Sequence, residues 1–165
     1  TTEQKDRYLF ERKLNSFRQN HPAFSNIEGA SAEIMPNGKP AWEWVNTNGE
    51  PMQQGDWNFQ YNRFLGYVLN GQDKTGKRFD DDFFVMASGN VDGTIAVQLP
   101  PTPHKGAWAI VFDTSKDSAY EDNNDYKPGN IYHINPHSVV VMTCRREEKS
   151  QEKEFLNIAL KQIER

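Results

Sequence analysis

The spacing of apolar residues changes character twice along this chain of 165 residues. Near the N-terminus, Phe10, Leu14 and Phe17 recur three or four positions apart, which predicts a helix over residues 2–20. Thr1 or Thr2 can cap this helix, and the pair at residues 21–22, His-Pro, ends it because proline disfavours a helical conformation in the preceding residue. We therefore expect a first unit, residues 1–22, that is essentially one helix.

Short apolar runs separated by turn residues replace the helical spacing beyond a stretch rich in glycine, proline and asparagine. They predict strands at residues 42–45, 64–69, 83–87, 94–99, 108–112, 131–134 and 138–143. The sequence shows no helical segment between them that could form a parallel crossover, so we expect an antiparallel β-sandwich over residues 23–146. Residues 83–86 and 139–142 are apolar at every position, as is typical of central strands covered on both faces.

The last segment, residues 147–165, returns to helical spacing. Its apolar stripe consists of Phe155, Leu156, Ala159, Leu160 and Ile163 among Lys, Glu and Gln. We expect an amphipathic C-terminal helix there. The fold class that the sequence predicts is thus mainly β, an antiparallel β-sandwich flanked by an N-terminal and a C-terminal helix.

Composition narrows the function classes. A net charge of -4 and a pI near 5.6 offer no surface that neutralises phosphates, so we do not expect a nucleic-acid partner. No apolar run reaches the roughly 20 residues that span a bilayer, so we expect no membrane partner. Cys144 is the single cysteine, which excludes an intrachain disulfide and predicts a cytoplasmic location. Its neighbours Arg145 and Arg146 predict a slightly lowered thiol pKa, although we expect a structural role.

A succession of short motifs runs through the chain at residues 44, 48–52, 56–58, 65–71, 81–88, 108–115 and 132–142. In this order they resemble the segment behind the catalytic barrel in isoamylase-type glycogen and starch debranching enzymes, members of the α-amylase superfamily (glycoside hydrolase family 13). The resemblance extends over residues 2–145, and the first helix is similar to the last helix of that barrel. The alternative is that this helix is an ordinary packing helix of the domain itself. The chain departs from the family at residues 23–29, which lack a basic run, and at residues 88–90, which read Ser-Gly-Asn where Asn-Ala-His is common.

The resemblance implies the non-catalytic C-terminal domain of an enzyme that hydrolyses α-1,6-glucosidic branch linkages. The family's catalytic carboxylates lie on barrel strands, and a barrel needs about 250 residues by itself. No carboxylate here lies in a family catalytic motif, so we assign no catalytic residue and expect the run Asp80, Asp81 and Asp82 to form a solvated turn. The expected partners are the barrel of the same parent enzyme and α-glucan. The alternative is a free-standing carbohydrate-binding, assembly or regulatory module without catalytic activity.

Four aromatic residues in the glycine-rich region are candidates for carbohydrate binding, since sugar rings stack on exposed aromatic faces: Trp42, Trp44, Trp57 and Tyr61. Trp44 and Trp57 match positions of the family that the chain resembles. The competing interpretation, which we favour, is that these rings fill the sandwich core or the contact with the barrel. Trp108, which begins an apolar run, is expected in the core.

The sequence predicts neither a metal site nor a cofactor. His133 and His137 are four residues apart, but Pro136 prevents the helix that would place both on one face, so we expect solvated loop histidines. Residues 122–125 start like a calcium loop but lack the glycine and the final glutamate of an EF-hand. For a polypeptide that acts alone, the apolar stripes of the terminal helices predict a homodimer through Phe10, Leu14, Phe17 and Leu160.

Overall fold

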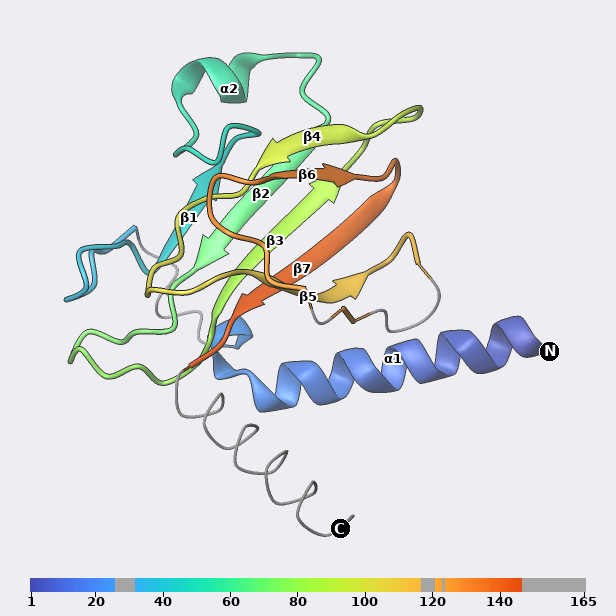
Figure 1. Ribbon diagram of the computed structural model, residues 1–165, viewed down its shortest axis with the longest axis horizontal. Coiled ribbons are helices and arrows are strands. Elements are labelled where there is room, and N and C mark those ends of the chain that lie inside the picture. Colours follow the sequence, from blue (N-terminus) through green and yellow to red (C-terminus); the bar gives the residue numbers. More distant parts are fainter. Residues whose placement is uncertain (26–31, 117–120, 123, 147–165) are drawn as a thin grey trace, which may run out of the picture.

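The computed structural model describes residues 1–25, 32–116, 121–122 and 124–146 (Figure 1). The expected C-terminal helix, residues 147–165, lies outside these residues. Within them the protein is mainly β, with the long helix α1 (Thr2–Asn20), the 3-10 turn η1 (Pro22–Phe24) and the short helix α2 (Gln54–Asn58). The strands are β1 (Trp42–Val45), β2 (Phe64–Leu69), β3 (Asp82–Ser88), β4 (Ile95–Gln98), β5 (Ala109–Asp113), β6 (Ile131–Ile134) and β7 (Ser138–Cys144).

Two antiparallel sheets form the body of the protein. The larger sheet has the strand order β1-β2-β3-β7-β5, and β4 pairs with β6 in the smaller one. All seven expected strands are present, and none of their ends differs from the expectation by more than one residue. The mainly β, antiparallel sandwich-like fold with an N-terminal helix is thereby confirmed.

The core lies between the two sheets, because alternate residues of each strand face the same side. It contains Val45, Phe64, Val68, Phe84, Met86, Val97, Leu99, Trp108, Ile110, Ile134, Val140, Met142 and Cys144. Trp108 is fully buried, as expected, and its indole Nε1 donates to the Pro100 carbonyl at 2.8 Å. We call this side of the larger sheet its inner face and the opposite side its outer face.

Helix α1 begins and ends where the sequence predicts. The Gln4 amide donates to Thr1 Oγ1 at 3.4 Å and the Thr1 amine donates to Gln4 Oε1 at 3.0 Å, which together form a capping box. At the other end His21 adopts an extended conformation before Pro22. These local signals explain why the pattern sufficed to place the helix.

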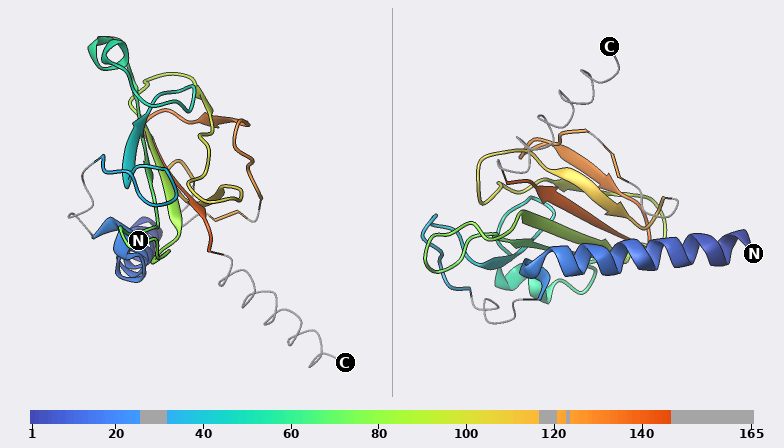
Figure 2. Two further views of the ribbon diagram at one scale, coloured as in Figure 1. Left: turned by 90° about the vertical axis from the view of Figure 1, so that its left-hand side faces the viewer. Right: turned by 90° about the horizontal axis from the view of Figure 1, so that it is seen from below.

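Helix α1 packs on part of the outer face, along one side of the larger sheet (Figure 2). The Phe17 ring meets Phe83 edge-on at 5.5 Å and Phe112 at 5.1 Å, and Phe10 meets Phe112 at 5.8 Å. Two residues of the helical stripe therefore contact this domain's own sheet, whereas Leu14 stays 37% exposed. The homodimer that also involves Leu160 remains a prediction, since that residue lies outside the described part of the chain.

The expected solvated turn at the start of β3 is wrong. Asp80, Asp81 and Asp82 are 1%, 3% and 0% exposed. Asp80 Oδ1 lies 2.7 Å from His21 Nδ1, and Asp80 Oδ2 accepts the Ala23 amide at 3.0 Å. The three carboxylates are buried because segments distant in the sequence supply donors to each of them.

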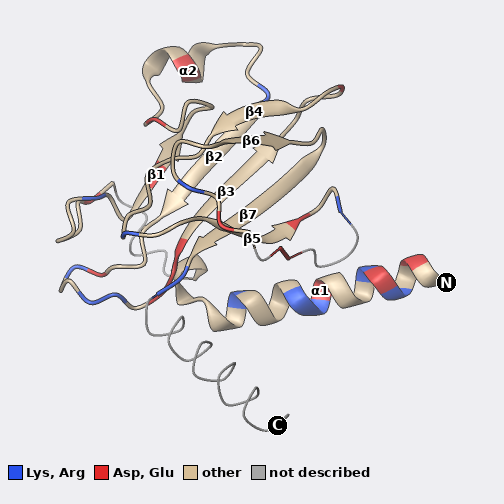
Figure 3. Ribbon diagram, viewed as in Figure 1, with Lys and Arg blue, Asp and Glu red and all other residues tan. Residues whose placement is uncertain are grey.

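The other two carboxylates also have partners outside the run of aspartates. Asp81 Oδ1 accepts the Arg146 amide at 3.0 Å, next to the basic end of β7 (Figure 3). Asp82 accepts the Gly71 amide at 2.8 Å, the Arg78 guanidinium at 3.3 Å and the His104 amide at 3.1 Å. We call residues 80–82 the carboxylate cluster; it joins the end of α1, two loops and the end of β7.

Crossing a membrane requires a helix that is both long and apolar. In residues 1–25, 32–116, 121–122 and 124–146, no helix combines the necessary length with the necessary apolar character.

Candidate functional site

Aromatic side chains gather on the outer face where α1 does not cover it. Trp42 and Trp44 alternate along β1 and therefore point to the same side. The antiparallel register pairs Trp42 with Leu69 and Trp44 with Tyr67, which brings these two residues of β2 to the same face. The Trp42 and Trp44 rings lie 5.1 Å apart at 79°, and the Trp44 and Tyr67 rings 5.5 Å apart at 76°.

Helix α2 adds a third tryptophan to this surface. The Trp57 ring lies 5.7 Å from that of Trp44 at 86°, and its side chain remains half exposed. The helix is fixed by a capping box between Gln53 and Asp56 and by the Asn46 amide, which donates to Asp56 Oδ2 at 3.3 Å. Trp57 is thus held at the end of β1 by a short helix that the sequence pattern did not predict.

The structure brings together three of the four expected carbohydrate-binding residues. Trp42, Trp44 and Trp57 form one continuous aromatic surface, whereas Tyr61 is 65% exposed and contacts Phe59 in a separate depression. None of the three tryptophans belongs to the core between the sheets. The part of our favoured interpretation that placed them in the sandwich core is therefore wrong, and contact with a barrel stays a prediction.

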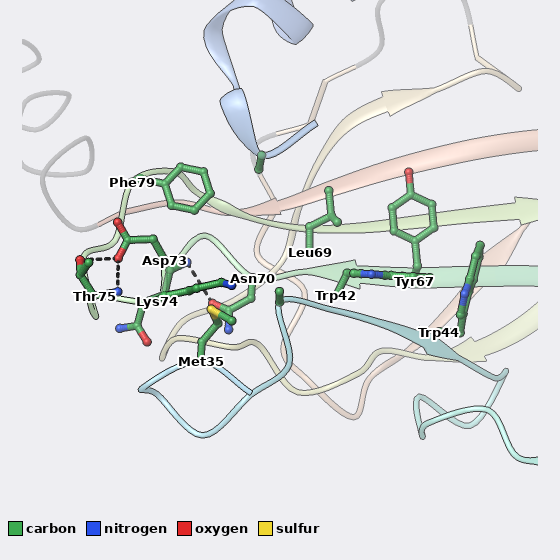
Figure 4. Close-up of a pocket in the computed structure, with 13 residues that line it drawn as sticks. Met35, Trp42, Trp44, Tyr67, Leu69, Asn70, Asp73, Lys74, Thr75 and Phe79 are labelled. Carbon is green, nitrogen blue, oxygen red and sulfur yellow. Dashed lines mark hydrogen bonds between the residues drawn. The ribbon is translucent and has the colours of Figure 1, made fainter. Parts of the chain in front are cut away.

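The aromatic surface continues into a groove of about 530 Å³ on the outer face (Figure 4). We call this the groove; it is lined by Ala23, Met35, Ala41, Trp42, Trp44, Tyr67, Leu69, Asn70, Gln72, Asp73, Lys74, Thr75 and Phe79. Its two ends differ in chemistry, since strand rings line one end and the polar turn at residues 70–76 lines the other. Sequence reasoning missed Tyr67, although its alternation with Leu65 and Leu69 in a strand beside β1 was a usable signal.

Hydrogen bonds fix the polar end of the groove. Asn70 and Asn37 exchange side-chain hydrogen bonds of 3.0 and 3.1 Å, and Gln72 Oε1 accepts the Asn37 amide at 2.7 Å. Asp73 Oδ1 accepts the Thr75 hydroxyl at 2.6 Å, and this bond, with the backbone amides of residues 75 and 77, lowers the Asp73 pKa. The turn therefore keeps a negative charge on Asp73 and holds one shape.

Within the described part of the chain, one buried side-chain polar atom in the wall of the groove has no hydrogen-bond partner. The indole Nε1 of Trp42 is buried, and no described residue accepts its hydrogen bond. Burial also raises the pKa of Tyr67, which keeps its hydroxyl neutral. The wall is therefore apolar apart from a neutral hydroxyl and one unsatisfied donor.

The carboxylate cluster is the place where a metal would be sought. Ligand atoms of His21, Asp80 and Asp81 lie within 4.8 Å of one another, the single such group among the described residues. The Ala23 amide donates to Asp80 Oδ2 and the Arg146 backbone amide to Asp81 Oδ1, both at 3.0 Å, and the Arg146 guanidinium lies 3.5 Å from the same Asp81 oxygen. The cluster is accordingly explained by hydrogen bonding within the protein.

Two further sequence expectations need correction. Cys144 is buried, and burial together with the nearby Asp82 raises its thiol pKa to about 11, in contrast to the expected lowering by Arg145 and Arg146. His133 is exposed as expected but lies within strand β6, and His137 occupies an exposed turn with φ of 48°.

Comparison with models of known protein families gives no match to this sequence, and comparison with curated proteins gives none either.

Proposed function

We propose that this chain is the non-catalytic C-terminal domain of a glycogen debranching enzyme of the isoamylase type, whose barrel hydrolyses α-1,6-glucosidic branch linkages. The motif order over residues 44–142 supports this proposal from the sequence. The observation that carries it in the structure is the apolar outer face of the larger sheet, which α1 covers only in part. The buried, unpaired Cys144 supports a reducing compartment, and we place the domain in the cytoplasm.

The uncovered part of the outer face is an apolar strip across β2, β3 and β7 that adjoins the groove at Tyr67. Its rows follow the strand register, Leu65-Ala87-Val139 and Tyr67-Val85-Val141. Leu65 is 41% and Val139 39% exposed. Apolar surface gains roughly 25 cal/mol per Å² when it leaves water, so a strip of this kind favours a covering partner.

Helix α1 supports the barrel of the parent enzyme as that partner. One side of the helix packs on the sheet through Phe10 and Phe17. Tyr8 and Leu9 on the remaining surface are 58% and 44% exposed. A helix that closes a barrel and leads into the sandwich needs apolar residues toward both bodies, and α1 offers them.

Two measurements test the proposal. The reading frame upstream of Thr1 is expected to encode a barrel with its three catalytic carboxylates, and a start codon close to Thr1 would contradict this. In the parent enzyme, Leu65→Glu should shorten the half-life of debranching activity on heating. Val91→Glu is the matched control, since Val91 is 67% exposed and lies outside the strip. Equal half-lives for both variants would refute the contact.

A second function, that of a free-standing glucan-binding module, is favoured by one observation. Trp57 is half exposed beside Trp44 and lies outside the core between the sheets. Retardation of the isolated chain in a glycogen-containing gel, together with a start codon next to Thr1, would select this function over the first.

A further inference from the structure

We propose that residues 147–165, which we call the C-terminal segment, dock their apolar stripe in the groove and so cover part of the outer face with this chain's own residues. The inference goes beyond the proposed function, because the barrel is assigned the strip across β2, β3 and β7 and not the groove. It rests on where the chain leaves β7, on the order of residues in the segment and on the apolar wall of the groove.

The chain leaves β7 beside one end of the groove. Arg146 is the last described residue, and its guanidinium Nη1 donates to the Phe79 carbonyl at 3.2 Å. The Arg146 backbone amide donates to Asp81 Oδ1 at 3.0 Å. The Phe79 side chain lines the groove at the end that the polar turn forms (Figure 4). The C-terminal segment therefore starts next to the groove, where hydrogen bonds fix the residue before it.

The residues of the C-terminal segment follow the same order as the lining of the groove. Residues 147–154 are all charged or polar, like the polar turn beside which the segment starts. Residues 155–163 carry the apolar stripe, and beyond the polar turn the groove is lined by Leu69, Trp42, Tyr67 and Trp44. A helix places residues three and four apart on one side, so the stripe can meet this wall while the lysines and glutamates stay in water.

The C-terminal segment is long enough to reach the apolar wall. Residues 147–154 separate Arg146 from the stripe, and they span about 12 Å as a helix or up to about 28 Å when extended. Tyr67 and Leu69 are two positions apart on β2, a separation of about 7 Å, and so are Trp42 and Trp44 on β1. As a helix, residues 155–163 extend about 12 Å, which is enough to cover both pairs.

The tether favours the C-terminal segment over a separate occupant. A short linker holds a segment near its site at an effective concentration in the millimolar range, so a free partner of similar affinity competes poorly. Trp42, Trp44 and Tyr67 are all partly exposed, and their apolar surface gains free energy when the stripe removes it from water. The groove therefore gives the segment an apolar surface within its reach.

Hydrogen–deuterium exchange of the 165-residue chain tests the docking, read by mass spectrometry on peptides that contain residues 155–163. We expect these amides to exchange at least about tenfold more slowly than in a synthetic peptide of residues 147–165, because an isolated helix of this length is marginal in water. Leu160→Glu places a charge in the stripe and should remove most of this protection. Lys161→Gln is the matched control, since it changes the net charge equally but lies opposite the stripe on a helix.

Substitutions in the groove test the other side of the contact. Trp44→Ala removes a large ring from the wall and should lower the protection of residues 155–163 by about tenfold. Ala41→Glu places a carboxylate in the groove without removing a ring, and we expect a loss of the same order. Tyr61→Ala is the control, because Tyr61 is exposed outside the groove. Melting temperatures establish that each variant is folded.

Three results would overturn the inference. Residues 155–163 could exchange as fast in the chain as in the peptide. Their protection could persist unchanged in both Trp44→Ala and Ala41→Glu, which would mean that the segment docks elsewhere. Protection that increases with protein concentration would assign the groove to a second copy of the chain. None of these results bears on the barrel contact, which is read from the upstream reading frame and from Leu65→Glu.

Discussion

Replacing Asp82 with alanine removes a carboxylate that has four contacts with donor groups of three other residues. Asp82 is fully buried and accepts the amides of Gly71 and His104 at 2.8 and 3.1 Å. Its Oδ2 lies 3.3 Å from the Arg78 guanidinium and 2.9 Å from His104 Nδ1. Asp82→Ala would leave a cation and several other donors without this partner in a site largely closed to water.

The size of the effect follows from the burial of the charges. Breaking a buried ion pair by removing one partner costs about 3–5 kcal/mol, because the other charge remains uncompensated. The net stability of a domain is about 5–15 kcal/mol, so this loss is a large part of it. For a domain of this size each kcal/mol lowers the melting temperature by about 2–4 °C, which predicts a drop of roughly 6–20 °C.

Urea denaturation followed by circular dichroism measures this loss, with Asp92→Ala as the control. Asp92 is exposed on a turn, so its substitution should change the free energy of unfolding by less than about 0.5 kcal/mol. Asp82→Asn, which keeps one acceptor but no charge, should lie between the two. A loss for Asp82→Ala below about 1 kcal/mol, near the scatter of surface substitutions, would refute the assignment of the carboxylate cluster as a stabilising element.

Three further changes test other parts of the structure. Burial raises the pKa of Asp80, but hydrogen bonds from His21 and two backbone amides outweigh it and hold the pKa below its ordinary value. The ionised Asp80 carboxylate therefore stabilises the folded protein fully above a pH of about 4, and this stabilisation is lost as the pH falls through the folded-state pKa. Asp80→Asn should weaken the pH dependence of the free energy of unfolding, measured in urea, below a pH of about 4. With a pKa of about 11, Cys144 should react with a disulfide reagent at pH 8 only after unfolding, and an equal rate in the native protein would contradict its burial. Phe17→Ala should lower the free energy of unfolding by about 2 kcal/mol, less than for a fully buried phenylalanine, while Leu14→Ala changes it by less than about 1 kcal/mol in the same assay.

The strands and α1 could be predicted because their signals are local. Each strand is a short apolar run between turn residues, and α1 carries its own cap at Thr1 and its own stop at Pro22. The pairing of Trp42 with Trp44 on one face also followed from alternation alone. The sequence did not indicate whether this would be the inner or the outer face of the sheet, because that depends on where the second sheet and α1 pack.

The burial of the carboxylate cluster could not be predicted for the same physical reason. Three consecutive aspartates predict side chains exposed to solvent when only neighbouring residues are considered. The His21 and Ala23 donors of Asp80 lie 59 and 57 residues away in the sequence, and the Arg146 donor of Asp81 lies 65 residues away. Two donors of Asp82 are 11 and 22 residues away. Helix α2 could not be predicted for another reason, because its five residues are too few to show a helical period in the sequence.

The carboxylate cluster also determines the shape of the groove. Asp82 accepts the Gly71 amide at 2.8 Å where the polar turn begins, and the Gly71 carbonyl accepts the Phe79 amide at 2.8 Å three residues beyond that turn. A side chain at position 71 would collide with the backbone of residues 80 and 81, so only glycine fits there. Asp80 in turn holds Ala23, whose side chain lines the groove just beyond the end of α1. The helix that we propose to face the barrel and the turn that closes the groove therefore depend on the same buried charges, so displacement of one would move the other.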